Sequence, residues 1–146
     1  MKLRQVTLAA LLVFIVSGCG KTTGQAEVEV DLLSGQPNPT WALAAEEIDE
    51  MTSLIEQLPA DHSAESSKEI VLGFRGFIIR GLTLPDIDED HSIIVLSERV
   101  IIETNGETAF TLVDEKGIVY KRLRELAKSQ LSDDLLNSIP NEANEQ

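Results

Sequence analysis

Cys19 is the residue of this chain most clearly suited to covalent chemistry, because it is the only cysteine and follows a patterned run. Lys2 and Arg4 stand near the start of the chain, an uncharged apolar stretch occupies residues 6–16, and two small residues come just before the cysteine. Basic residues, a short apolar stretch and small residues in this order are typical of a secretory signal. Since about 20 apolar residues are needed to cross a bilayer, the stretch is too short for a membrane-spanning helix. The pattern therefore predicts an exported protein.

The run Val16-Ser17-Gly18-Cys19 resembles the lipobox of bacterial lipoproteins, with valine where leucine is commoner. The resemblance implies that the signal peptide, residues 1–18, is removed and that the thiol of Cys19 is acylated. The lipid on Cys19 would anchor the protein on the exported side of a membrane, and residues 19–26 would form a short tether. Because Gly20 rather than aspartate follows, the resemblance implies the periplasmic face of the outer membrane in a cell with two membranes.

The charge of the chain restricts its partners. The net charge is −13, and it becomes −15 when Lys2 and Arg4 leave with the signal. A field of this sign repels nucleic acid at long range, so a nucleic-acid partner is not expected. We expect the mature chain to contact the membrane and a protein partner in the cell envelope.

Polar groups and an aromatic ring are concentrated in the segment Ser34-Gly35-Gln36-Pro37-Asn38-Pro39-Thr40-Trp41. Its two prolines fix the backbone, so the loop could present Gln36, Asn38 and Trp41 to a ligand or partner. The alternative is a stiff connection whose tryptophan fills the core, since tryptophan is usually well buried. Arg75, in an otherwise apolar strand, has two interpretations as well. It either binds an anion beside the Asn38 loop or forms a structural ion pair or hydrogen bond.

The same loop, together with Gly73-Phe74-Arg75-Gly76-Phe77, resembles a family of small bacterial proteins of unknown function. The shared pattern is approximately SGxPNPxW, then a helix, then a strand with an aromatic-Arg-Gly-aromatic run. The resemblance covers about half of the mature chain and implies a single fold from Val28 onward, without implying an activity.

Asp86, Asp88 and Asp90 alternate as the ligands of calcium loops do. The match to an EF-hand loop then fails, because His91 stands where glycine is needed and Ser97 where a bidentate glutamate is needed. These acids are therefore only weak metal candidates, and a solvated acidic loop is the expected structure. No nucleophile motif or phosphate-binding glycine loop is present, so neither a catalytic residue nor a cofactor is predicted.

Hydrophobic periodicity predicts a single α+β domain at residues 27–139, with a mostly antiparallel sheet and helices packed on one face. The expected order is β-α-β-β-β-α-α, followed by a disordered tail at 140–146. Strands are expected at 27–32, 70–80, 92–104 (one long strand, or two short ones divided at 97–99) and 107–113, and helices at 43–58, 118–129 and 132–139. Asn105-Gly106 predicts a hairpin turn. The apolar stripe of the first helix is expected to pack on Val28, Val30, Ile78, Ile94, Ile101 and Leu112.

Two classes of function are compatible with this sequence. The first is a lipid-anchored, non-catalytic binding module of the cell envelope, which would use a surface formed by Gln36, Asn38, Trp41 and Arg75. The second is a small envelope hydrolase that uses carboxylates or a loosely bound cation. A hydrolase would show a cleft with converging acids of raised pKa, whereas a binding module would show an apolar or aromatic surface patch near Trp41 and no deep polar pocket.

Overall fold

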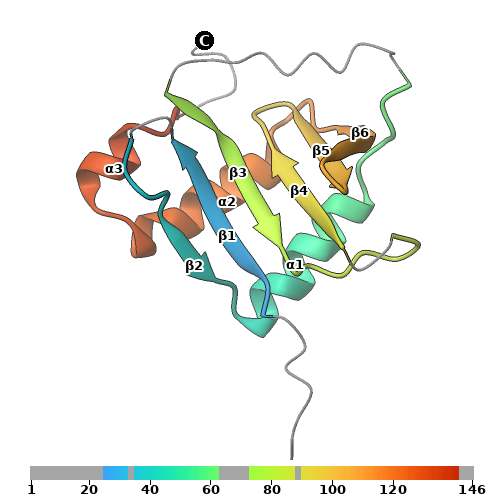
Figure 1. Ribbon diagram of the computed structural model, residues 1–146, viewed down its shortest axis with the longest axis horizontal. Coiled ribbons are helices and arrows are strands. Elements are labelled where there is room, and N and C mark those ends of the chain that lie inside the picture. The colour runs from blue at the N-terminus through green and yellow to red at the C-terminus, as the bar shows by residue number, and fades with distance from the viewer. Residues whose placement is uncertain (1–24, 33–34, 63–72, 88–89, 142–146) are drawn as a thin grey trace, which may run out of the picture.

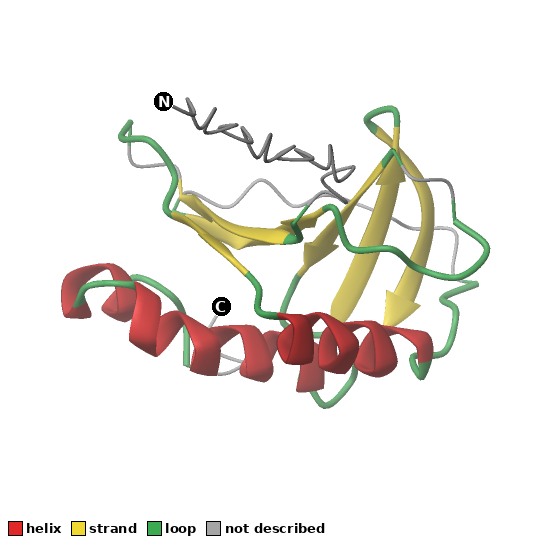
Figure 2. Cartoon of the chain, turned by 90° about the horizontal axis from the view of Figure 1, so that it is seen from below, coloured by secondary structure: helices red, strands yellow, loops and turns green. Residues whose placement is uncertain are grey.

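The computed structural model describes residues 25–32, 35–62, 73–87 and 90–141. These residues form one antiparallel sheet of six strands with the helices on one of its faces (Figures 1 and 2), which confirms the predicted α+β class. The predicted signal peptide, Cys19 and Asp88 lie outside the described residues. Within the described part of the chain, no helix has the length and apolar character needed to cross a membrane.

The strands follow one another in the sheet in the order β2-β1-β3-β4-β5-β6. Their bounds are β1 Glu27–Leu32, β2 Thr40–Ala42, β3 Phe74–Arg80, β4 His91–Val95, β5 Arg99–Thr104 and β6 Glu107–Val113. The helices are α1 Ala45–Glu56, α2 Ile118–Gln130 and α3 Asp133–Asn137. The expected order lacks β2 and counts residues 92–104 as one strand, which the structure divides into β4 and β5. β2 was missed because a strand of three residues that follows two prolines has too few positions to show a period of two.

The turns between the later strands agree with the sequence. Asn105 and Gly106 both have positive φ, at 56° and 80°, and join β5 to β6 in an antiparallel pair. This confirms the predicted hairpin, since a type I′ turn needs positive φ at both central residues. The apolar run at 92–104 is divided into β4 and β5, and Leu96 N–H donates to the carbonyl of Arg99 across the connection.

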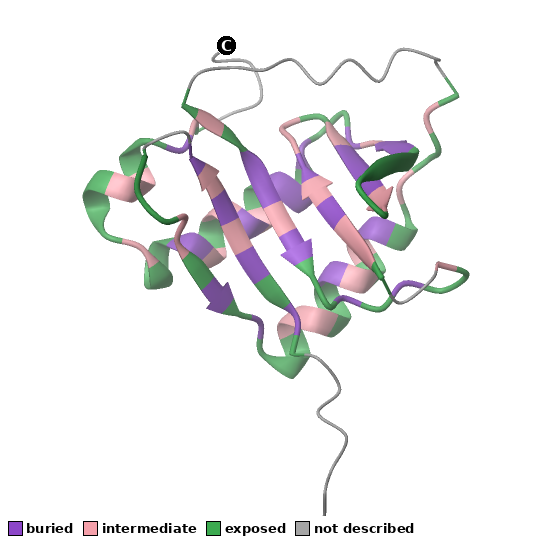
Figure 3. Cartoon of the chain, in the orientation of Figure 1, coloured by how far each residue is buried: buried purple, intermediate pink, exposed green. Residues whose placement is uncertain are grey.

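The core lies between the sheet and helices α1 and α2. On β1, Val28, Val30 and Leu32 are buried and the acids between them are not, so burial alternates along the strand (Figure 3). Because successive side chains of a strand point to opposite faces, the acids lie on the face away from the core. The helices contribute buried side chains to the same core, namely Met51 and Ile55 from α1 and Val119, Tyr120, Leu123 and Ala127 from α2. The amphipathic patterns of sheet and helices therefore meet as expected for β1 and α1.

Three isoleucines that were expected in this core lie on the other face of the sheet. Ile78, Ile94 and Ile101 are paired with one another across β3, β4 and β5, and Ile78 also pairs with Glu29 of the acid-bearing face of β1. Each has an apolar sequence neighbour that takes the core position instead, namely Phe77, Ile79, Ile93 and Ile102. Because both residues of each adjacent pair are apolar, a period of two cannot tell which one faces the helices.

Both ends of the domain extend further than predicted. Ala26, assigned to the tether, is fully buried and its carbonyl accepts the N–H of Leu43 at 2.8 Å. Pro140, assigned to the tail, has its carbonyl bound by the hydroxyl of Tyr120 at 2.9 Å. The ordered fold therefore includes both residues, while residues 142–146 of the predicted tail are outside the described part of the chain.

Candidate functional site

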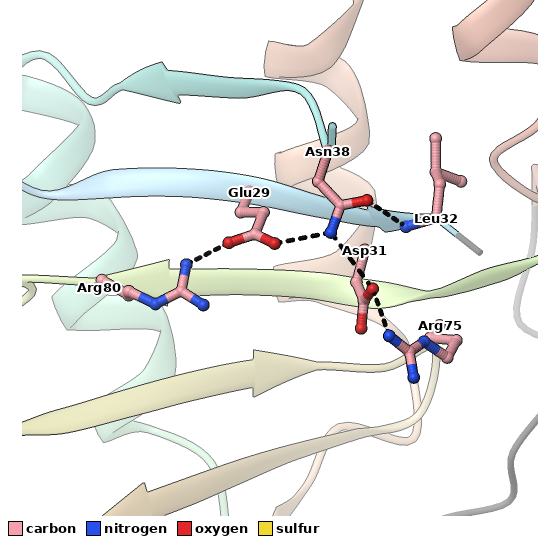
Figure 4. A network of polar contacts seen from close by, with 6 residues as sticks. All are labelled: Glu29, Asp31, Leu32, Asn38, Arg75 and Arg80. Atoms are coloured by element: carbon pink, nitrogen blue, oxygen red, sulfur yellow. Dashed lines mark hydrogen bonds and ion pairs between the residues drawn. The ribbon is translucent and has the colours of Figure 1, made fainter. Parts of the chain in front are cut away.

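Asn38 fastens the loop between β1 and β2 to the sheet face opposite the helices (Figure 4). Its Nδ2 donates to Glu29 Oε1 at 2.7 Å and to Asp31 Oδ1 at 3.4 Å. Its Oδ1 accepts the backbone N–H of Leu32 at 3.1 Å. All polar atoms of the amide are thus engaged by one strand, and an asparagine between two prolines is held in a single orientation.

Two arginines of β3 complete this arrangement, which we call the Asn38 network: Glu29, Asp31, Asn38, Arg75 and Arg80. Arg75 Nη2 donates to Asp31 Oδ1 at 2.7 Å, and Arg80 Nη1 forms an ion pair with Glu29 Oε2. Each carboxylate of the network therefore has one cationic partner and one contact with the Asn38 amide. Loop, β1 and β3 are joined by polar contacts without an uncompensated charge.

A β-bulge in β3 directs Arg75 into this network. Asp31 pairs with Gly76 and the next residue of β1, Leu32, pairs with Phe74, so Arg75 is the extra residue of the bulge. Without a bulge, Phe74 and Phe77 would point to opposite faces because they are three positions apart. With it, both rings enter the core at a centroid separation of 5.4 Å. Gly76 permits the bulge with φ of 126° and a close approach to the carbonyl of Val95.

The electrostatics of the network favour its charged form. The hydrogen bond from Asn38 lowers the pKa of Glu29, burial opposes this shift, and the hydrogen bond and charge of Arg80 add to the lowering. Glu29 is therefore ionised at neutral pH and acts as an acceptor. A carboxylate in this state cannot serve as a general acid, which needs a raised pKa.

The predicted site residues have different positions in the structure. Asn38 and Arg75 are brought together through Asp31, without a direct contact between the two in the described hydrogen bonds. Gln36 and Pro37 are exposed at the tip of the loop. Trp41 is only 7% exposed and packs edge-on against Phe77 in the core, with its Nε1 unpartnered among the described residues. Trp41 thus fills the core and does not share the surface of the Asn38 network.

The weak metal candidates do not form a described cation site. Asp86 and Asp90 lie in the described residues, and the part of the chain that is described contains no group of three or more His, Cys, Asp or Glu side chains arranged to hold a metal. Asp86 is one of two non-glycine residues described with positive φ, at 63°. This conformation belongs to a turn in which Ile87 N–H donates to Leu84 O at 3.4 Å.

A second surface feature, an apolar groove of about 570 Å³, was not predicted. It runs between the end of α1, the turn at residues 84–87, and the helix-side face of β5 and β6. The side chains that define it are Ile55, Leu58, Leu84, Ile87, Phe110 and Leu112. Phe110 is 38% exposed, whereas most other large apolar side chains of the described residues are buried or partly buried in the core.

A second bulge aims Phe110 into this groove. Glu103 pairs with Thr108 and Ile102 pairs with Phe110, so Ala109 is the extra residue in β6. The bulge turns Phe110 to the face of buried Ile102. A period-two pattern cannot reveal a bulge, so the hydrophobic pattern of the sequence does not predict that Phe110 lies in the groove. The one available signal is compositional, since residues 45–56, 81–87 and 107–113 contain acids but no lysine or arginine.

Comparison of the chain with protein-family models, with curated proteins and with solved structures gave no match.

Proposed function

We propose that this chain is a lipid-anchored, non-catalytic binding module of the cell envelope that contacts an envelope protein through the β1–β2 loop. The anchor is the acylated Cys19, on the exported side of a membrane, and outer-membrane placement is proposed for a cell with two membranes. The observation that carries the binding role is the Asn38 network, which holds the loop against the sheet while Gln36 and Pro37 stay exposed at its tip.

Preorganisation is the physical reason for this proposal. A loop that is fixed before it meets its partner loses little conformational entropy on binding, so a small contact surface gains affinity. Pro37 and Pro39 restrict the backbone. Both polar atoms of the Asn38 amide form hydrogen bonds with β1. Arg75 stays 38% exposed and keeps N–H donors beyond the one that Asp31 accepts, so it can add a polar contact at the edge of the loop.

Hydrolysis by carboxylates or a loosely bound cation is less well supported. The carboxylates beside the loop are each paired with arginine, and the pKa of Glu29 is lowered where a general acid would need it raised. The geometry therefore favours recognition by the loop over acid–base chemistry at these residues.

The anchor is tested by mass spectrometry of the mature protein purified from its native envelope. We expect acyl mass on Cys19 and no residues before it. Cys19→Ala should leave the protein folded but no longer recovered with membranes, because the domain begins at Ala26, after the cysteine. An unmodified mature chain that begins elsewhere would contradict the anchor without affecting the binding proposal.

The loop is tested by photo-crosslinking in the cells that make the protein. A photoreactive amino acid at Gln36 should give a discrete crosslinked protein, while the same group at Gln130, exposed on α2, should not. Arg75→Ala then distinguishes the role of the arginine. Loss of the crosslink at unchanged stability supports a contact with the partner, and loss in proportion to stability supports a purely structural ion pair. Equal crosslinking from Gln36 and Gln130 would contradict the loop as the binding surface.

A further inference from the structure

We propose that the groove beneath β6 is a second interaction surface, which binds a polypeptide segment that carries large apolar side chains flanked by lysine or arginine. This inference is independent of the β1–β2 loop, since the two surfaces share no residue. The apolar floor would hold the anchoring side chain, and the acidic surroundings would select the charge of the segment that carries it.

The shape of the groove fits an anchoring side chain. Its volume of about 570 Å³ is within the range of about 300–1,000 Å³ that ligand-binding clefts occupy. Leu84 and Leu112 line the groove and are buried, whereas Phe110, which also lines it, is 38% exposed. Aromatic side chains are enriched in the cores of protein interfaces, and the residues that contribute most to binding cluster near the interface centre. The bulge at Ala109 matters here, because in a regular strand Phe110 would point to the opposite face of the sheet.

Charge complementarity identifies the occupant. Glu56 and Asp86 line the groove, and neither forms an ion pair within the described residues. The elements around them, α1, the stretch 81–87 and β6, contain no lysine or arginine at all. The described ion pairs of the chain instead join β1 to β3, α1 to α2 near Glu50, and two residues within α2. A partner with basic residues around its apolar anchor would neutralise two acids that form no ion pair with the described residues.

The same charge disfavours the other occupants of an apolar groove. A second copy docked groove to groove would bring an equally acidic rim against this one. An anionic bilayer would be repelled for the same reason. Like charges placed face to face oppose association, so the groove is selective against both.

The experiment uses the full lipidated chain in phosphatidylcholine nanodiscs, with empty nanodiscs as the blank. The probe is a labelled synthetic peptide in which lysines flank a Phe-Leu pair, and fluorescence anisotropy reports its binding. Two matched peptides are compared with it, one with glutamates for the lysines and one with serines for the apolar pair. We expect only the lysine-flanked apolar peptide to bind, and we expect added salt to weaken it, because exposed charges are screened.

Matched variants locate the site. Phe110→Ser should weaken binding about tenfold, which corresponds to about 1.4 kcal/mol. Ile118→Ser removes the other large apolar side chain that is exposed among the described residues, 45% exposed on α2 and outside the groove, and should change binding less than about twofold. Glu56→Gln with Asp86→Asn should weaken binding, and asparagine tolerates the positive φ of Asp86. Asp133→Asn with Asp134→Asn removes equal charge from α3, on the side of the molecule away from β6 (Figure 1), and serves as the control.

Each alternative result overturns the proposal in a distinguishable way. Equal loss from Phe110→Ser and Ile118→Ser would place the binding outside the groove. Equal binding of the glutamate-flanked peptide would refute charge selection. Binding no stronger than the blank would refute a peptide occupant. Self-association of the protein that is lost in Phe110→Ser would assign the groove to a second copy.

Discussion

Two β-bulges in this sheet turn side chains to a new face, with opposite consequences. At Arg75, the bulge sends an aromatic ring into the core and an arginine to the outer face, where Asp31 neutralises it. At Ala109, the bulge sends Phe110 to a part of the helix side where it stays exposed, among segments without a basic residue.

The difference between the regions lies in what their side chains find nearby. Around the first bulge, the polar and apolar groups that it moves all meet partners within the chain, which gives a rigid surface. Around the second, an aromatic ring and two acids lack described partners, which gives a surface that a partner can complete. The same backbone device thus gives a surface with paired charges in one place and a surface with unpaired groups in the other.

The largest expected effect comes from Gly76→Ala, which attacks the first bulge directly. An added Cβ would stand 2.8 Å from the Val95 carbonyl oxygen and 3.0 Å from Leu96 Cδ2, at a backbone φ of 126°. Backbone strain and the clash together should lower the free energy of unfolding by about 3 kcal/mol or more. Chemical denaturation measures the loss.

Gly73→Ala is the matched control for this substitution. Gly73 also has positive φ, at 108°, but nothing lies within 4 Å of its Cβ position. Its loss should reflect backbone strain alone, about 1 to 2 kcal/mol. Equal losses at the two glycines would mean that close packing against β4 is not what Gly76 provides.

Removing the Asn38 amide from the Asn38 network should have a smaller effect on stability. Asn38→Ala leaves the N–H of Leu32 without its side-chain acceptor and takes a donor from Glu29, so we expect a loss of about 1 to 3 kcal/mol. Asn137→Ala is the control, because Asn137 is exposed at the end of α3 and should lose less than about 0.5 kcal/mol. If both substitutions cost the same, the loop is not held by Asn38.

The contrast between the bulges also explains how far the sequence could be interpreted. The strand at β1, both long helices and the Asn105-Gly106 hairpin were predicted because each has a local signal, in periodicity or turn chemistry. Ile78 and Ile94 were predicted on the wrong face of the sheet, because apolar residues occupy both faces of their strands. A glycine inside a strand can suggest a bulge, as Gly76 does, but no residue type signals the one at Ala109.

The candidate site, like the fold, could be predicted only in part. The sequence predicts that the loop and Arg75 lie near each other, and the structure shows that Asp31 connects them. That Trp41 fills the core was only one of two interpretations, because burial depends on which face of β2 it occupies. The groove depends on three segments far apart in the chain, and only folding brings them together.

At the groove beside the second bulge, Phe110→Ala should hardly change stability. The ring is already partly in water, so its removal should lower the free energy of unfolding by about 1 kcal/mol or less, well below the cost for a buried phenylalanine. Ile118→Ala, at a residue exposed to a similar degree, should behave alike. A loss of several kcal/mol at Phe110 alone would show that the ring supports the fold, and would remove the contrast between the two regions.

The smallest expected effect is a pH dependence of stability that arises from Glu29 in the Asn38 network. The folded protein holds the pKa of Glu29 below its ordinary value, first through the Asn38 hydrogen bond and then through Arg80, against the opposing effect of burial. A carboxyl whose pKa is lowered by folding stabilises the protein fully above its unfolded value, about 4.3 for glutamate. This contribution is lost as the pH falls through the lowered pKa of the folded state. Stability should therefore decrease with acidification in that window.

NMR titration of the Glu29 carboxyl in two variants tests the origin of this shift. Asn38→Ala should raise its pKa, because the first cause of the lowering is removed. Arg80→Ala should also raise it, whereas Arg80→Lys keeps the positive charge and should restore part of the lowering. In denaturation experiments, Glu29→Gln should reduce the loss of stability on acidification, since its amide does not titrate. If the pKa of Glu29 stayed unchanged in Asn38→Ala, the Asn38 amide would not stabilise the carboxylate, and its contact with Glu29 would not help to hold the loop.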